Sequence, residues 1–371
     1  MKILVAPNSM KGSLSAFDFA DAIESAFLNC SDNFEIRKVP VADGGDYTGE
    51  VLHRCLNARR VKLEVTGPLG EKVQSGYSVS GQTAIVEMAD ASGMKRVDKK
   101  VLNPLKASTF GTGEMIADAL SKGCREIVLA VGGSATVDGG SGMMEALGFA
   151  LLDNKGKKLC GNGENLQNIR NVVVPSIPEN ISVKIICDVD NPLLGKNGAA
   201  AVFGPQKGAT PEMVPVLEKG LKNWSEVIQK QTGKNYSQVE GAGAAGGIAV
   251  PLMAFFNAEM VSGSDFVLSQ INFDEHVKWA DLVITGEGKI DAQTLNNKAP
   301  LAVAKRAKKY NKPVLAIAGK TEKEASDIFD GIFSLTNGPM TLDFAMENAK
   351  ALVYTISFEL AKLILKLQAK K

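Results

Sequence analysis

The sequence predicts an α/β protein with two domains: a doubly wound parallel-sheet domain of the Rossmann or flavodoxin-like type, and an inserted α/β domain. Apolar strand-like runs alternate with helical segments at both ends of the chain, which is typical of a parallel sheet covered by helices on both faces. The middle of the chain contains short strands separated by Gly and Pro turns. The length of 371 residues also favours more than one domain.

The N-terminal segment begins the parallel-sheet pattern. We expect a buried strand over residues 3–6 and an amphipathic helix over 15–28, with Ser13 or Ser15 as its N-cap. A second strand is expected over 36–41. It runs directly into the sequence ADGG.

The middle of the chain differs from both ends. Three short strands over 61–65, 73–79 and 84–88 are separated by Gly-containing turns, a pattern that indicates antiparallel pairing. Helix–strand alternation then returns. The expected helices and strands cover 112–121 (helix), 126–131 (strand), 142–147 (helix), 183–187 (strand), 211–231 (helix) and 246–256 (helix).

The last third of the chain alternates most regularly. Strands are expected over 282–285, 314–317 and 332–335, and apolar residues at steps of three and four predict a closing helix over 345–367. Because both chain ends carry the same pattern, we predict that they build one sheet together. The predicted domains are residues 1–60 with 265–371, and the inserted residues 61–264.

The composition excludes several classes of function. Lys and Arg number 42 and Asp and Glu 41, so a near-neutral chain has no overall field for nucleic acid or a membrane surface. No apolar run approaches the ~18 residues of a membrane span. Five dispersed cysteines without a CxxC pair favour reduced thiols and a cytoplasmic protein. Both a monomer and a homodimer stay open.

Polar, Gly-rich segments follow five of the predicted strands. In open parallel sheets, ligands bind beyond the carboxyl ends of the strands. One such turn is often only a turn, and an Asp there is often only a helix N-cap. Five together favour a shared ligand site. The segments are NSMKGS (8–13), DGGD (43–46), GGSATVDGG (132–140), DVDNP (188–192) and GEGKID (286–291).

The 132–140 segment suits a phosphate group. Glycine allows close backbone approach and exposes N–H groups, while Ser134 and Thr136 add hydroxyl donors. Lys11 and Lys289 supply positive charge. Carboxylates of these segments are able to hold Mg²⁺ or take a proton from an attacking hydroxyl; they are Asp43, Asp138, Asp188, Asp190, Glu287 and Asp291.

Other nucleotide signatures are weak or absent. Residues 241–246 match GxGxxG, but no convincing strand precedes them, which favours a tight loop entering a close-packed helix. The Walker A sequence and the protein-kinase signature set are both absent. His53 and His276, the two histidines, lie in polar helical settings, so a histidine-based triad has little to work with.

Ten stretches, taken in order and spacing, resemble the type-1 glycerate kinase family. The resemblance implies ATP-dependent phosphorylation of D-glycerate with Mg²⁺, and a two-domain α/β fold with the active site between the domains. The stretches are PNSMKGSLSA (7–16), PVADGG (40–45), VTGPLGE (65–71), GTGE (111–114), GGSATVDGG (132–140), CDVDNPLL (187–194), FGPQKG (203–208), GAGAAGG (241–247), TGEGKIDAQ (285–293) and KAP (298–300).

On this basis we expect the phosphates of ATP at the 132–140 segment and near Lys11, and the carboxylate of glycerate at Lys289 or Lys298. Asp188 is the candidate for orienting the attacking hydroxyl. The candidate catalytic residues are Asp188, Lys11, Asp43 and Lys289; the candidate metal ligands are Asp43, Asp188 and Asp190; the candidate cofactor-binding residues are Gly132, Gly133, Ser134, Thr136, Asp138, Gly139, Glu287, Asp291 and Lys298.

The favoured product is 2-phosphoglycerate, with 3-phosphoglycerate as the alternative. A non-catalytic nucleotide- or metabolite-binding protein on the same scaffold is the competing hypothesis. The sequence departs from the family pattern at Asn8 (usually Asp), Met10 (usually aromatic), Asp46 and Tyr47 (usually Glu and Gly) and Asn297 (usually Gly). The change at Asn8 removes a carboxylate from the first loop.

Overall fold

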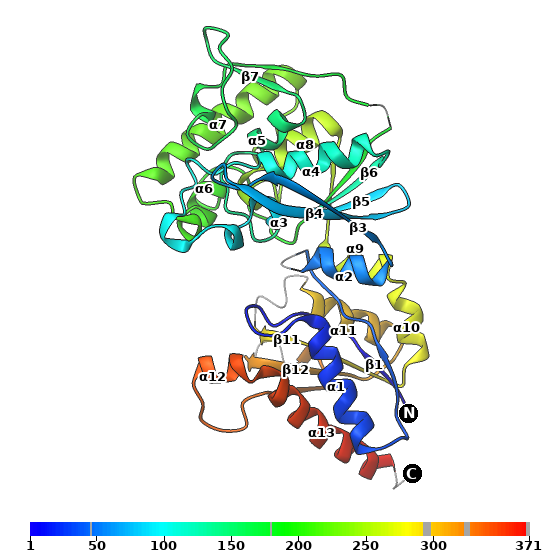
Figure 1. Ribbon diagram of the computed structural model, residues 1–371. Helices are drawn as coiled ribbons and strands as arrows, with labels where there is room; N and C mark the ends of the chain where they lie inside the picture. Colours follow the sequence, from blue (N-terminus) through cyan, green and yellow to red (C-terminus); the bar gives the residue numbers. More distant parts are fainter. Residues whose placement is uncertain (45–46, 179, 292–297, 323–326, 369–371) are drawn as a thin grey trace. The chain divides into compact units, whose positions relative to one another are not determined.

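The computed structural model describes residues 1–44, 47–178, 180–291, 298–322 and 327–368, and the chain forms two compact units (Figure 1). Unit 1 comprises Met1–Asp43, Glu50–Cys55 and Ser262–Lys371, and unit 2 comprises Gly44–Gly49 and Leu56–Val261. That each unit is a domain with the boundaries predicted above stays a prediction. Asp46 and Asn297, two of the departures from the family pattern, lie outside the described residues.

Unit 1 contains a five-stranded sheet in which every neighbouring pair is parallel, with the order β13-β12-β11-β1-β2. The chain adds β2 on one side of β1, and later adds β11, β12 and β13 on the other side. The order therefore reverses between β1 and β11, as in doubly wound sheets. The strands are β1 (Lys2–Val5), β2 (Glu35–Lys38), β11 (Leu282–Ile290), β12 (Val314–Thr321) and β13 (Gly331–Ser334).

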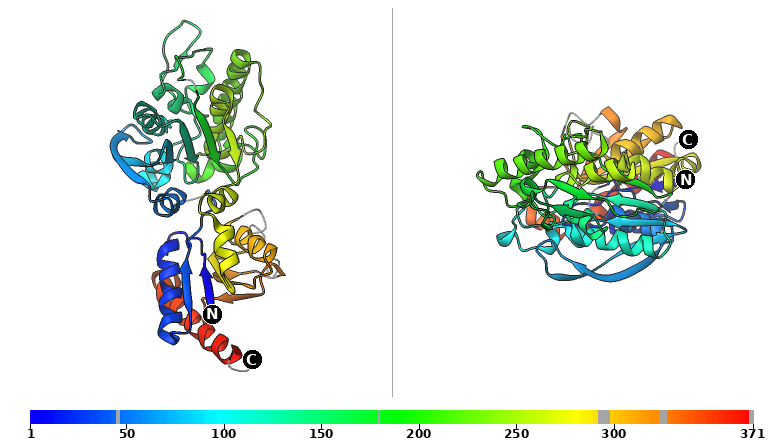
Figure 2. Two further views of the ribbon diagram at one scale, coloured as in Figure 1. Left: turned by 90° about the vertical axis from the view of Figure 1, so that its right-hand side faces the viewer. Right: turned by 90° about the horizontal axis from the view of Figure 1, so that it is seen from above.

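Helices cover both faces of the unit 1 sheet (Figure 2). The helices α1 (Ala16–Cys30) and α13 (Ala349–Gln368) pack together on one face, and α9 (Gly263–Gln270), α10 (Phe273–Trp279) and α11 (Ala299–Lys309) lie on the other. Ser15 caps α1, because its side chain accepts a hydrogen bond from the N–H of Asp18. Phe19 and Ile23 of α1 are fully buried against the strands.

Two predictions for this part of the chain were wrong in detail. The strand expected over 282–285 continues to Ile290, so much of the predicted 286–291 loop belongs to β11. The single closing helix is divided into α12 (Leu342–Glu347) and α13, because Asn348 ends α12 and its side chain donates to the carbonyl of Phe344. Leu363 and Leu367, two of the apolar residues whose spacing predicted the helix over 345–367, are exposed.

Unit 2 contains a six-stranded mixed sheet with the order β10-β9-β6-β5-β4-β3. The pairs β3–β4 and β4–β5 are antiparallel, as predicted for residues 61–88, whereas β5, β6, β9 and β10 run parallel. The strands are β3 (Arg59–Thr66), β4 (Lys72–Ser80), β5 (Thr83–Glu87), β6 (Glu126–Ala130), β9 (Ser182–Ile186) and β10 (Glu259–Val261), and β7 (Ala150–Leu152) pairs separately with β8 (Asn171–Val173).

The helices of unit 2 pack on this sheet around one apolar core. The helix α4 (Phe110–Ser121) contacts β3, β4 and β5, and α8 (Ala249–Phe256) contacts β9. Tyr77 and Trp224 are fully buried in the core. The remaining elements of unit 2 are α3 (Ala89–Ser92), α5 (Ser141–Ala146), α6 (Ala199–Phe203), α7 (Met213–Thr232) and the 3-10 helices η1 (Met94–Arg96), η2 (Lys99–Val101), η3 (Leu166–Asn168), η4 (Pro205–Lys207) and η5 (Ala244–Gly246), whereas most of α2 (Thr48–Cys55) belongs to unit 1.

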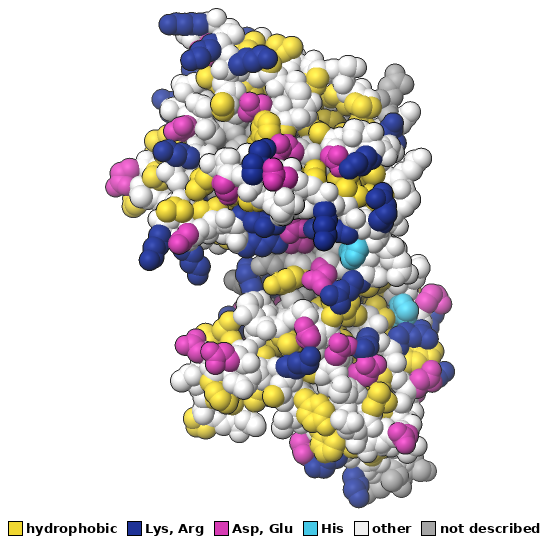
Figure 3. Space-filling model, in the orientation of Figure 1, with side chains coloured by type: hydrophobic (Ala, Val, Ile, Leu, Met, Phe, Trp, Pro, Cys, Tyr) yellow, Lys and Arg dark blue, Asp and Glu magenta, His cyan; other side chains and the backbone are white. Residues whose placement is uncertain are grey.

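These sheets and layers confirm the predicted α/β class with parallel sheets. Basic and acidic side chains are interspersed on the visible face of each unit (Figure 3), as the net charge of +1 suggests. Within the described ranges, no helix has the length and apolarity that a membrane span requires.

Candidate active site

The first candidate region lies at the reversal point of the unit 1 sheet. The segment after β1 continues alongside β11, because the N–H of Ala6 donates to Ile284 O and the N–H of Asn8 donates to Gly286 O, both at 2.8 Å. Ligands of doubly wound sheets bind beside such reversals, at the carboxyl ends of the strands. The region therefore brings the first polar loop next to Glu287, whose side chain is buried.

Asn8 also connects two of the predicted loops. Its Nδ2 donates to Oδ2 of Asp43 at 3.1 Å, and its Oδ1 accepts the N–H of Ser9 at 2.8 Å. The departure from the family pattern at this position thus places an amide donor beside Asp43. With Asp in place of Asn8, two carboxylates would adjoin here.

Lys11 lies in the loop after β1, the same loop that carries Asn8. A Cβ added to Gly288 would lie 3.8 Å from the backbone nitrogen of Lys11, so the loop passes directly over β11 at this glycine. Lys11 itself is exposed. Lys298 lies immediately before α11, and its carbonyl accepts the N–H of Ala302.

Lys289 is already surrounded by carboxylates of the protein. Its Nζ lies 2.5 Å from Asp291 and 3.2 Å from Glu322. The hydrogen bond to Asp291, followed by that to Glu322, raises the pKa of Lys289. Asp291 is buried, whereas Lys289 is about half exposed, at 48% of its side chain. A substrate carboxylate at Lys289 would have to compete with both acidic side chains.

The second candidate region is the carboxyl edge of the unit 2 sheet. The register aligns Glu87 with Ala130, Ala130 with Ile186, and Ile186 with Val261. These residues end four adjacent parallel strands, so the segments that follow them start side by side. The 132–140 loop follows β6, and Asp188 and Asp190 follow β9.

Asp138 organises the 132–140 loop from inside. It is fully buried and accepts hydrogen bonds from the N–H and Oγ1 of Thr109 and from the N–H groups of Gly140 and Gly142. Burial raises the pKa of Asp138, and these four donors oppose that rise. Its carboxylate is thus occupied by the protein's own donors, which is a structural role that the sequence did not indicate.

Lys207 lies beneath the same loop and was missed in the sequence. Its Nζ donates to Ser134 Oγ and to the carbonyl of Thr136, both at 2.7 Å, and the residue is only 2% exposed. Burial lowers the pKa of Lys207 to about 7. The segment 203–208 carries the family resemblance, but a single Lys in it has no pattern that would predict this contact.

The 241–247 loop holds the two other loops of this edge together. The N–H of Gly139 donates to Gly246 O, and the N–H of Gly243 donates to Asn191 O, both at 2.9 Å. Gly246 has a φ of +76°, and a Cβ there would lie 2.2 Å from Thr136 O. The described residues include no strand directly before residue 241. The interpretation as a tight loop entering a packed helix is confirmed.

The predicted metal ligands come from both units. Asp43 belongs to unit 1, whereas Asp188 and Asp190 belong to unit 2. Asp188 is half-buried and Asp190 is exposed. In the part of the chain that the structure describes, no three His, Cys, Asp or Glu side chains form a group suited to a metal ion. Beside Asp188, burial raises the pKa of the Cys187 thiol to about 11.

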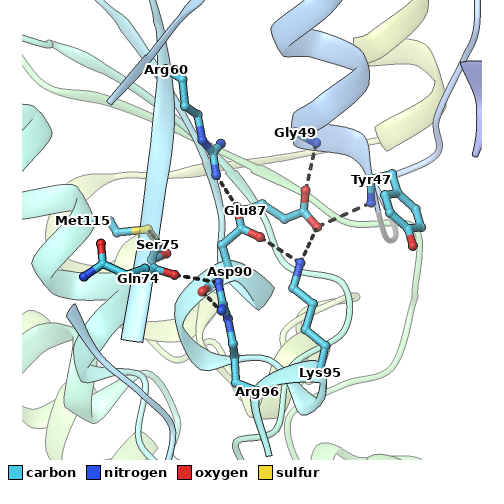
Figure 4. Close-up of polar contacts among 10 residues, drawn as sticks. All are labelled: Tyr47, Gly49, Arg60, Gln74, Ser75, Glu87, Asp90, Lys95, Arg96 and Met115. Atoms are coloured by element: carbon cyan, nitrogen blue, oxygen red, sulfur yellow. Dashed lines mark hydrogen bonds and ion pairs between the residues drawn. The ribbon is translucent and has the colours of Figure 1, made fainter. Parts of the chain in front are cut away.

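Glu87, at the end of β5, is a further buried carboxylate that sequence reasoning missed (Figure 4). Its Oε2 accepts the N–H of Gly49 at 3.2 Å, and its Oε1 faces the N–H of Tyr47 at 3.4 Å and Nζ of Lys95 at 3.8 Å. Burial, followed by the charge of Asp90, raises its pKa. The sequence signal that could have identified Glu87 is a carboxylate at the very end of a predicted strand.

Comparisons with known proteins cover nearly the whole chain. The model of a family described as "Glycerate kinase family" matches residues 3–365. The chain is 43% identical over 358 residues to the glycerate kinase of Bacillus subtilis strain 168, and 42% identical over 358 residues to the glycerate 2-kinase of Escherichia coli K12, with 94% of each chain covered in both cases. The crystal structure of a "putative glycerate kinase 2 from Salmonella typhimurium LT2" matches with a TM-score of 0.88 and 40% identity, covering 100% of this chain and 99% of that one.

Proposed function

The chain belongs to the glycerate kinase family, and from this premise we propose that it transfers a phosphoryl group from ATP to the 2-hydroxyl of D-glycerate. The 132–140 loop carries the proposal, because it follows β6 at the carboxyl ends of the parallel strands of the unit 2 sheet, where Gly132 and Gly133 are partly exposed. The name of the Escherichia coli relative, glycerate 2-kinase, supports the 2-position. The product is then 2-phosphoglycerate.

The 132–140 loop is our candidate for the phosphates of ATP. Gly133 has a positive φ, which lets the backbone turn without a Cβ in the way, whereas the N–H of Gly139 already donates to Gly246 O. Thr136 is fully buried, and its Oγ1 has no hydrogen-bond partner among the described residues, which leaves this hydroxyl for an added group. Ser134 is held by Lys207.

Glycerate presents a carboxylate and a hydroxyl that must be oriented separately. Lys298, at the start of α11, is the better candidate for the carboxylate, because Lys289 already pairs with two acidic side chains. Helix N-termini also favour anions. Asp188 stays our candidate for orienting the attacking hydroxyl, a task that phosphoryl transfer requires of one carboxylate.

The acidic residues present fit Mg²⁺. This ion usually binds one or two protein carboxylates and completes its shell with phosphate oxygens and water, so a cage of three side chains is not needed. Asp188 and Asp190 follow one strand end, and Asp43 accepts a hydrogen bond that orients it. When bound, Mg²⁺ neutralises charge on the phosphates of the nucleotide.

The test is an assay of purified protein with ATP, Mg²⁺ and D-glycerate. ADP release that requires all three supports the kinase. Coupling the product to enolase without a mutase then identifies the position, because only 2-phosphoglycerate is an enolase substrate. ADP release without enolase signal would move the reaction to the 3-hydroxyl. Binding of both substrates without ADP release would instead favour the non-catalytic alternative.

A further inference from the structure

Lys207 is a buried cation that the proposed reaction does not yet use. It ends η4, and the next residue, Gly208, turns the chain away with a φ of +90°. Its Nζ donates to Ser134 Oγ and Thr136 O. Among the ion pairs of the described residues, none involves Lys207.

This arrangement leaves the charge of Lys207 poorly compensated. An ammonium group has three N–H donors, and the described residues supply two acceptors for them, both belonging to the 132–140 loop. Burying an unpaired charge is costly. Burial accordingly lowers the pKa of Lys207 to about 7, and the charge of Asp138 opposes that decrease. The charged and neutral forms are therefore close in free energy at neutral pH.

We propose that Lys207 is a positioning residue whose protonation is coupled to phosphate binding at the 132–140 loop. The inference rests on the proposed function, since it takes this loop as the phosphate site. Lys207 acts through its two contacts, which fix the Ser134 hydroxyl and the Thr136 carbonyl on either side of Ala135. The Thr136 hydroxyl, which has no partner in the described chain, belongs to the same stretch.

The sign of the coupling follows from electrostatics. An anion at the loop stabilises the ammonium form and so raises the pKa of Lys207. Above neutral pH, binding must then take up a proton, and affinity falls by up to roughly tenfold for each pH unit. Below neutral pH the lysine is already charged, and affinity levels off. Asp138 is the charged group that acts on Lys207 from the neighbouring segment.

The experiment measures binding without turnover, with inorganic sulfate as the probe. Sulfate mimics phosphate but does not titrate in this range, so any proton taken up belongs to the protein. Its affinity, and that of ADP, is measured by thermal shift and calorimetry from about pH 8.5 to about pH 6. We expect both affinities to rise roughly tenfold per unit down to neutral pH in the native protein. We expect a weaker and pH-independent affinity in Lys207→Met.

Tyr77→Phe is the matched structural control, because it removes a hydrogen bond of a buried side chain in unit 2, to Asp118, away from the loop. It should keep the native pH profile. If Lys207→Met does not fold, Ser134→Ala replaces it, since that variant keeps the lysine but loses one of its two contacts. It should shift the midpoint of the sulfate profile.

A flat sulfate profile in the native protein, or an unchanged slope in Lys207→Met, would overturn the proposal. A pH-dependent affinity for D-glycerate, without one for sulfate or ADP, would also overturn it, because the anion coupled to Lys207 would then be a carboxylate. The two proposals fail separately. A protein that shows no ADP release but keeps the sulfate profile refutes the kinase and retains the coupling.

Discussion

The side-chain amide of Asn8 donates a hydrogen bond to Oδ2 of Asp43 at 3.1 Å and thereby connects the loops that follow β1 and β2. Replacing Asn8 with Asp would set two carboxylates side by side. Their repulsion should lower the free energy of unfolding by about 1 kcal/mol or more. Mg²⁺ should restore it, because adjacent carboxylates bind divalent cations. Thermal unfolding with and without Mg²⁺ tests this, with Asn8→Ala as the control that shows no Mg²⁺ effect.

Asp138 should be the most sensitive carboxylate of unit 2. In Asp138→Asn, the new amide would face N–H groups that now donate to the carboxylate, so the free energy of unfolding should fall by about 3 kcal/mol. Urea unfolding provides the measurement. Asp32→Asn changes an exposed residue by the same chemistry and should have little effect. Equal losses in both variants would contradict the structural role of Asp138.

Glu87 should give an unusual pH dependence. Its folded pKa is raised above 4.5, chiefly by burial, so the ionised form destabilises the fold. The difference in unfolding free energy between the native protein and Glu87→Gln should therefore decrease as pH rises from about 4.5 through the raised value. Urea unfolding at a series of pH values measures it.

Glu126 is the matched control with the opposite sign. Hydrogen bonds from Lys184 and then Thr83 lower its pKa, so its ionised form stabilises the fold. The difference in unfolding free energy between the native protein and Glu126→Gln should therefore increase with pH, and it should be lost as the pH falls through the lowered pKa of Glu126. The same sign for both pairs would refute the assignment of Glu87.

A comparison of Gly246 with Gly233 distinguishes the cost of a steric overlap from the cost of placing a side chain at a positive φ. Their φ values are +76° and +75°, but a Cβ would lie 2.2 Å from Thr136 O at Gly246 and would meet nothing within 4 Å at Gly233. Gly233→Ala should cost about 1 kcal/mol. Gly246→Ala should cost about 2 kcal/mol more, because the overlap must be relieved. Chemical denaturation of the two variants measures this, and equal costs would mean that the loops are not tightly packed.

Asp188→Asn tests the proposed chemistry. If Asp188 orients the attacking hydroxyl, kcat should fall by at least about 100-fold while thermal stability stays close to native. Asp153→Asn, in an exposed turn of the same unit, should leave kcat unchanged. Full turnover of a folded Asp188→Asn protein would remove this residue from the mechanism.

Local patterns predicted much of the fold. The apolar periodicity and the capping residue Ser15 identified α1, because both signals depend only on residues that are close together in the sequence. The length of β11 was not predictable in this way. Its apolar run stops at Thr285, yet the strand continues, because Gly286 lets β12 approach so closely that a Cβ would lie 2.1 Å from Ile317 O. Gly286 interrupts the apolar pattern of the sequence, but it does not end the strand.

The candidate site was predictable only in part. Strand-end loops pointed to the 132–140 segment and to Asp188, since the edge of a parallel sheet is a consequence of topology. Lys207 was not predictable, because it meets Ser134 across 73 positions of sequence and follows no strand. Asp138 was predicted to face a ligand, but the donors that surround it come partly from Thr109 on another segment.

The hydrogen bonds from Gly139 to Gly246 and from Gly243 to Asn191 have a consequence for engineering. They join three loops that are distant in sequence, residues 132–140, 188–192 and 241–247, into one hydrogen-bonded structure at the edge of the unit 2 sheet. A designer who grafts the 132–140 loop alone into another protein would leave its backbone partners behind. Changes of substrate preference in this chain should therefore be sought with all three loops varied together.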